Sequence, residues 1–153
     1  MKQALRNFAF GAALTFAATT AQAMDGVTTM EVDADFATVA QDLNDAIVNK
    51  GYVVDYHGFI GDMLKRTAED VGATETIYKD AEFFTFCSAV VSREVMEVEI
   101  GNIAFCPYVL FVYEAAATPG TVTVGFRRLP DGQGRDKVNG ILEEIVKEAS
   151  GDF

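Results

Sequence analysis

The sequence predicts an α+β fold: a mostly antiparallel sheet of about five strands with helices packed on one face. Three observations indicate it. Amphipathic helix patterns occupy residues 36–50 and 135–149, β-rich runs fill much of the chain between them, and Thr118-Pro119-Gly120 supplies a tight turn between two such runs. This order of elements favours a layer of helices on a sheet.

Residues 27–32 are rich in β-branched side chains and indicate the first strand. Asp35 then offers a helix N-cap, and Gly51 stands where a C-cap glycine ends a helix. Between them, residues at three- and four-residue spacing predict one apolar helix face: Phe36, Val39, Ala40, Leu43 and Ile47.

The middle of the chain predicts shorter elements. Residues 52–57 indicate a second strand, and residues 60–71 a short helix with Ile60, Leu64 and Val71 directed inward. Residues 82–89 carry aromatic side chains for both faces, which is typical of a buried central strand. Ser92 is expected to cap a short helix that runs to residue 98.

The last third of the chain predicts a β-hairpin and a helix. Residues 108–116 and 121–129 are the two hairpin strands, joined through the Pro-Gly turn. The final helix, residues 135–149, has one apolar face, formed by Val138, Ile141, Leu142, Ile145 and Ala149. We expect this helix and the helix of residues 36–50 to pack on the same face of the sheet.

The first 23 residues have the layout of a secretory signal peptide. Lys2 and Arg6 precede an uncharged run, and Ala21-Gln22-Ala23 places small residues at the −3 and −1 positions of a cleavage site. The apolar run is too short to cross a bilayer, which needs about 20 apolar residues. We therefore expect a periplasmic or secreted protein without a membrane anchor, with residues 24–153 as a single domain.

The charge balance excludes some partners. The full chain has a net charge of −11, and loss of Lys2 and Arg6 with the leader makes it −13. Nucleic-acid affinity comes largely from Lys and Arg that neutralise phosphates, so a nucleic-acid partner is not expected. Adhesion to anionic membrane surfaces is disfavoured for the same reason.

Cys87 and Cys106 are the two cysteines of the chain. An even number in an exported protein favours pairing, and both flank strands expected to be neighbours, so we predict an intramolecular disulfide. Two buried free thiols, or a reactive or ligand-binding pair, remain alternatives. Neither cysteine lies in a Cys-x-x-Cys pattern, so a thioredoxin-like redox motif and covalent haem attachment are unsupported.

Other side chains offer candidate ligand contacts. His57, the single histidine, could join Cys87 and Cys106 as a ligand set for zinc or copper, or lower the pKa of a thiol. A lone histidine at a strand end is more often a surface or hydrogen-bonded residue. Arg127 and Arg128 should point to opposite faces of a strand, so that one of them faces the sheet surface without helices. There it could receive a carboxylate or another acidic ligand group. In a chain this acidic, the alternative is pairing with an Asp or Glu of the same chain.

Six aromatic residues of the predicted strands are expected to form core: Phe83, Phe84, Phe86, Tyr108, Phe111 and Tyr113. An alternating subset exposed on an open sheet face would instead make a ligand platform or a dimer surface. The Gly-x-Gly-x-x-Gly, Gly-x-Ser-x-Gly and P-loop patterns are absent from the sequence. We therefore expect no cofactor and assign no catalytic residue.

Four local features resemble the domain of unknown function 302 family. The first is the N-terminal strand and helix that end at Gly51-Tyr52, and the second is Cys87 closing a strand before a short helix. The others are Cys106-Pro107 before the next strand and Val112-Tyr113-Glu114 at its end. The resemblance covers residues 27–129 and implies a compact α+β fold, often a dimer, with no agreed reaction. The chain departs from the family pattern at Ser88, where Asn is common, and in its extra C-terminal helix.

Two functional interpretations follow. The first is an exported, non-catalytic binding or interaction module for a small molecule or a protein. The alternative is a thiol- or metal-dependent accessory protein that uses Cys87, Cys106 and His57.

Overall fold

The structure is a computed structural model that describes residues 24–151. Its elements run in the order β1 (Val27–Val32), α1 (Phe36–Asn49), β2 (Val54–Gly58), α2 (Ile60–Thr67), β3 (Tyr78–Phe86), α3 (Ala89–Val98), the 3₁₀ helix η1 (Ile100–Phe105), β4 (Tyr108–Ala115), β5 (Val122–Arg127) and α4 (Arg135–Ser150). The leader predicted for residues 1–23 lies outside the described residues. Within residues 24–151, no helix is both long enough and apolar enough to span a membrane.

The five strands form one antiparallel sheet in the order β1-β5-β4-β3-β2. The predicted β-hairpin is present as β4 and β5, in which Leu110 pairs with Phe126 and Val112 with Val124. The N-terminal strand β1 is the edge strand next to β5, and its Val27 pairs with Arg127. The predicted α+β class and antiparallel sheet are therefore confirmed.

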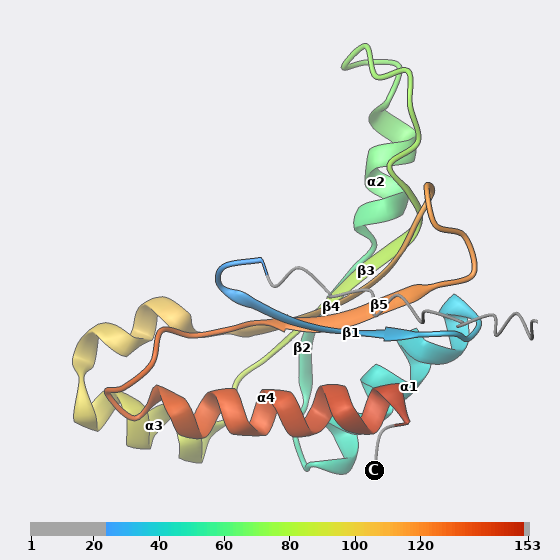
Figure 1. The fold of residues 1–153 in the computed structure, drawn as a ribbon. Coiled ribbons are helices and arrows are strands. Elements are labelled where there is room, and N and C mark those ends of the chain that lie inside the picture. Colours follow the sequence, from blue (N-terminus) through green and yellow to red (C-terminus); the bar gives the residue numbers. More distant parts are fainter. Residues whose placement is uncertain (1–23, 152–153) are drawn as a thin grey trace, which may run out of the picture.

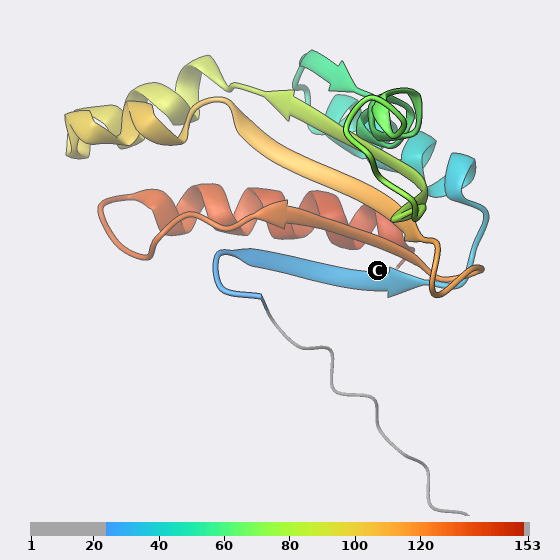
Figure 2. The same ribbon diagram turned by 90° about the horizontal axis from the view of Figure 1, so that it is seen from above.

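Helices α1 and α4 lie side by side on the same face of the sheet, as predicted (Figures 1 and 2). Asp35 caps α1 by accepting hydrogen bonds from the amides of Ala37 and Thr38. The two helices bury their apolar faces against alternate residues of the strands, and the fully buried side chains include Leu43, Ile47, Phe84, Phe86, Leu110, Val124, Phe126, Leu142 and Ile145. Burial of this apolar surface is the main stabilising contribution to the fold.

The opposite face of the sheet is open over much of its area. Helix α2 rises from this side at one end of β3 (Figure 1). The first turn of α2 packs closely against β3 at Gly61. A larger residue does not fit there, because a Cβ would lie 2.7 Å from the backbone nitrogen of Ala81. The inward position predicted for Val71 is wrong, because α2 ends at Thr67 and Val71 is 74% exposed in the turn that follows.

Two predicted boundaries, those of strand β3 and of the start of helix α3, differ from the structure. Strand β3 begins at Tyr78 and ends at Phe86, so it is longer and ends earlier than predicted. Ser88, not Ser92, caps α3: its hydroxyl accepts a hydrogen bond from the amide of Val91 at 3.2 Å. Ser92 instead lies inside the helix, where its hydroxyl hydrogen-bonds the Tyr108 hydroxyl at 3.2 Å.

Candidate functional site

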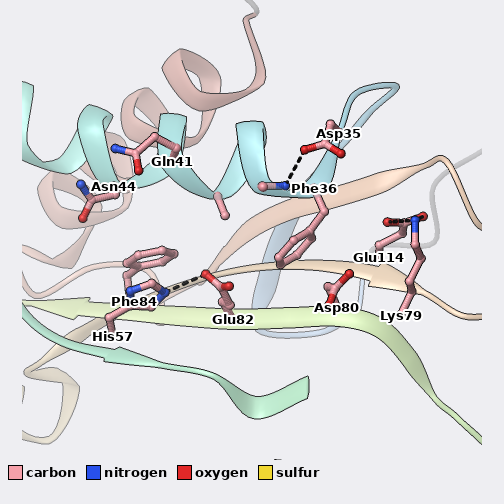
Figure 3. Close-up of a pocket in the computed structure, with 12 residues that line it drawn as sticks. Asp35, Phe36, Gln41, Asn44, His57, Lys79, Asp80, Glu82, Phe84 and Glu114 are labelled. Carbon is pink, nitrogen blue, oxygen red and sulfur yellow. Dashed lines mark hydrogen bonds and ion pairs between the residues drawn. The ribbon is translucent and has the colours of Figure 1, made fainter. Parts of the chain in front are cut away.

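A cavity of about 660 Å³ opens between the start of α1 and the edge of the sheet formed by β2 and β3 (Figure 3). Its volume lies within the range of small-molecule sites, which is roughly 300–1,000 Å³. The side chains that line it are mostly polar or charged: Asp35, Gln41, Asn44, His57, Lys79, Asp80, Glu82 and Glu114, together with Phe36 and Phe84. We refer to it as the α1–β3 pocket.

The alternation of side chains along β3 places three of these residues on one face. Asp80, Glu82 and Phe84 occupy every second position of β3, so they share the face that α1 covers. His57 of β2 is directly opposite Phe84, and Glu114 of β4 is opposite Asp80. The pocket is therefore built by the register of neighbouring strands.

His57 and Glu82 form the most defined contact of the pocket. The Nε2 atom of His57 donates a hydrogen bond to Oε2 of Glu82 at 2.7 Å (Figure 3). The imidazole also lies between two rings, with centroid distances of 4.3 Å to Phe59 and 4.1 Å to Phe84. Because the Glu82 side chain is only 19% exposed, this contact holds one carboxylate at a fixed place in the pocket wall.

A second fixed carboxylate is that of Glu114, whose side chain is 3% exposed. Each of its oxygens accepts a hydrogen bond from Lys79 Nζ at 3.0 Å. Oε1 also accepts a hydrogen bond from the backbone amide of Gly120 at 2.8 Å. The hydrogen bonds from Gly120 and Lys79 hold the pKa of the Glu114 carboxyl below its ordinary value of 4.5. The same contact raises the pKa of Lys79 above 10.5.

The pocket carries an excess of negative charge. Four carboxylates line it, those of Asp35, Asp80, Glu82 and Glu114, against one ammonium group, that of Lys79. Lys65 approaches from outside the pocket and contacts Asp80 Oδ1 at 3.3 Å. The electrostatic potential inside the pocket therefore favours positively charged groups.

Cys87 and Cys106 are joined in a disulfide, with their Cα atoms 6.3 Å apart. The bond lies at the end of the sheet where α3 and η1 connect β3 to β4. His57 pairs with Phe84, three residues before Cys87, which corresponds to about 10 Å along the strand. The structure thus joins the two cysteines and places His57 with Glu82 instead. Among residues 24–151, no group of three His, Cys, Asp or Glu side chains has a geometry that could hold a metal ion.

Arg127 is the last residue of β5 and Arg128 follows it outside the strand, so their placement on opposite faces of one strand stays a prediction. Arg128 binds Oδ1 of Asp131 at 2.8 Å. Arg127 pairs with Val27 on the open sheet face, and its side chain makes no hydrogen bond or ion pair with any residue in the described part of the chain.

The aromatic residues divide between the two sheet faces. Phe84, Phe86 and Tyr108 are buried under the helices, as expected for core. The half-buried residues Phe83, Phe111 and Tyr113 instead line the open face, so that the expectation of core fails for this alternating subset.

The sequence did not identify the acidic lining of the α1–β3 pocket. Its signal is the alternation Asp80-x-Glu82-x-Phe84 within a strand, which places carboxylates on a face that apolar residues otherwise occupy. The partner residues Asp35 and Glu114 come from distant parts of the chain, so that only the sheet register brings them to the same cavity.

Solved structures with a similar fold include one whose description is informative. The chain is similar in fold to an uncharacterised conserved protein DUF302 from Bacillus stearothermophilus. The superposition has a TM-score of 0.65 and covers 82% of this chain and 99% of the other, at 14% sequence identity. No protein-family model and no curated protein matches the sequence. The likeness supports the fold that the sequence resemblance implied.

Proposed function

We propose that this protein is an exported, non-catalytic binding module whose ligand is a small organic cation held in the α1–β3 pocket. The observation that carries the proposal is the fixed placement of Glu82 and Glu114 in a pocket with four carboxylates and one ammonium group. Ligand pockets combine a shaped cavity with a few placed polar groups, and this cavity has both.

Primary ammonium groups suit the pocket best. An ammonium group donates three hydrogen bonds, and carboxylates are its preferred acceptors. Glu82 and Asp80 are two residues apart on one face of β3, which separates them by about 7 Å. A short diamine can therefore reach both carboxylates, while Phe36 and Phe84 contact its methylene groups.

The experiment is a calorimetric titration of the purified protein with 1,4-diaminobutane, with 1,4-butanediol as the uncharged control. We expect the diamine to bind, the diol not to bind, and added salt to weaken binding, because exposed charges are screened. Replacement of Glu82 by Gln should weaken diamine binding by about tenfold, since it removes a charge-assisted hydrogen bond.

The matched control is Glu97→Gln, which removes the same charge from the exposed surface of α3, where Glu97 pairs with Arg93. Diamine affinity in this variant should stay within about twofold of the parent protein. Equal weakening in both variants would indicate a general charge effect, and absence of any diamine binding would refute the proposal.

Thiol exchange is a second candidate function, and one observation favours it. The disulfide is only partly buried, and Cys87 directly precedes Ser88, the N-cap of α3. A helix N-terminus stabilises a thiolate, which makes the corresponding disulfide easier to reduce. Rapid reduction by a stoichiometric dithiol, followed by reoxidation with no change in melting temperature, would support this role over a structural bridge.

A further inference from the structure

The open face of the sheet presents the cation of Arg127 beside an apolar surface. Arg127 is exposed at the end of β5, and its guanidinium has no hydrogen-bond or ion-pair partner within residues 24–151. The adjacent Arg128 instead binds Asp131. In the sheet register, Val27 lies directly beside Arg127 on the open face.

Val27 also lines a hollow of about 420 Å³ on this face. The hollow is mainly apolar, with Phe83, Phe111 and Tyr113 along its floor and Ile60 of α2 in its wall. We refer to it as the open-face groove. Its aromatic floor alternates along the strands with the residues that face α1 and α4, and Glu82 is the one residue of the described chain that lines both this groove and the α1–β3 pocket.

The shape of the groove depends on the close approach of the Phe111 ring of β4 to Gly125 of β5. A Cβ at Gly125 would lie 2.9 Å from Cζ of the Phe111 ring and 2.4 Å from the carbonyl oxygen of Thr28. Glycine at this position therefore lets the ring lie against the neighbouring strand. The result is an aromatic floor that begins two residues, or about 7 Å, from Arg127.

We propose that the open-face groove binds a small molecule with an apolar body and one carboxylate, the carboxylate at Arg127 and the body over Phe111 toward α2. A guanidinium binds a carboxylate through two parallel hydrogen bonds, which supplies orientation as well as affinity. Thr123, which pairs with Tyr113, lies four residues from Arg127 along β5, a distance of about 13 Å. This length of groove accommodates a medium-length alkyl chain.

The charge of the chain favours a monoanion. With a net charge of −11 before removal of the leader, the protein repels multiply charged anions, and Glu31 lies on the open face two rows from Arg127. One guanidinium balances one carboxylate but not a dianionic phosphate. The shape favours a small ligand over a second copy of the chain, because α2 projects from this face and obstructs another flat sheet (Figure 1).

The experiment titrates the protein with octanoate and, as the uncharged control, 1-octanol. Replacement of Arg127 by Gln should weaken octanoate binding by about tenfold or more, because it removes a charged partner. The matched control Arg128→Gln removes the same charge from the adjacent residue and should stay within about twofold. 1-Octanol should bind the parent protein and Arg127→Gln equally, since it contacts only the apolar floor.

A second variant tests the groove without disturbing the core. Thr29 lines the hollow from the edge strand β1, so Thr29→Trp should fill the cavity and abolish binding of both octanoate and 1-octanol. Diamine binding in the α1–β3 pocket should be unchanged in Thr29→Trp and Arg127→Gln. Failure of octanoate to bind, equal effects of the two arginine variants, or octanoate binding that survives Thr29→Trp would each overturn the proposal.

Discussion

Glu82 receives a 2.7 Å hydrogen bond from His57 across the pairing of β3 with β2, and the imidazole is held between Phe59 and Phe84. This contact orients a carboxylate that would otherwise rotate freely at the mouth of the α1–β3 pocket. It also explains the position of the single histidine, which the sequence offered as a hydrogen-bonded residue, a metal ligand or a partner of a thiol.

His57→Ala should weaken diamine binding and reduce stability together. Removal of the ring leaves Glu82 without its donor and opens a gap between two aromatic rings, so we expect a loss of about 1–3 kcal/mol in the free energy of unfolding. Chemical denaturation measures this loss. His57→Gln, which retains a donor, should recover part of the diamine affinity; identical affinity in both variants would mean that His57 does not position Glu82.

Acid should weaken the contact between Glu114 and Lys79. Because the folded-state pKa of Glu114 lies below its ordinary value of 4.5, its contribution to stability is complete above pH 4.5 and is lost as the pH falls through the lowered pKa. The pKa of Lys79 is raised above 10.5, so its contribution is present below that pH and is lost only as the pH rises through the raised value. Melting temperatures of the parent protein and Glu114→Gln should therefore converge below pH 4.5 and separate at neutral pH. A constant difference across this range would contradict the assignment.

Loss of the disulfide should destabilise the fold. A bridge across a sequence separation of 19 residues contributes about 3 kcal/mol by restricting the unfolded chain, which corresponds to a fall of roughly 10 °C in Tm for Cys87→Ala. Thermal melts under non-reducing conditions measure it, with Cys87→Ala/Cys106→Ala as the variant without a free thiol. Full thiol labelling of the denatured, non-reduced parent protein would show that the bridge is absent.

Replacement of Gly58 by alanine should destabilise the fold. A Cβ there would lie 2.3 Å from the Phe83 ring, so the ring or β2 must move in Gly58→Ala. Overpacking of this kind typically costs about 1–3 kcal/mol. Since His57 precedes Gly58, diamine affinity should fall as well. Gly140→Ala, at a position with open space on α4, is the control and should leave both stability and diamine affinity unreduced.

Periodicity predicted most of the fold. The apolar spacing from Phe36 to Ile47 and from Val138 to Ala149 identified the two helices and their common face, because burial of one stripe dominates their stability. The incorrect predictions concern helix caps and boundaries, which depend on individual polar interactions. Both Ser88 and Ser92 are residues that can cap a helix, and the structure distinguishes them: Ser88 accepts the Val91 amide, whereas Ser92 makes a buried contact with Tyr108.

The sites were predicted less well, because each depends on register. The disulfide could be inferred from residue count and strand adjacency, and the presence of an arginine on the open sheet face from strand alternation. That Glu82 faces His57 follows only from the pairing of β2 with β3, which a single sequence does not specify. For the same reason the sequence left the division of the aromatic residues between core and open face as an alternative to a wholly buried set.

Amide chemical-shift mapping during titration with 1,4-diaminobutane tests the central claim most directly. We predict that the largest perturbations fall on His57, on residues 79–84 of β3 and on the first turns of α1 around Phe36 and Gln41, with saturation at one ligand per chain. Perturbations spread over the acidic surface without saturation, or concentrated away from the α1–β3 pocket, would contradict it.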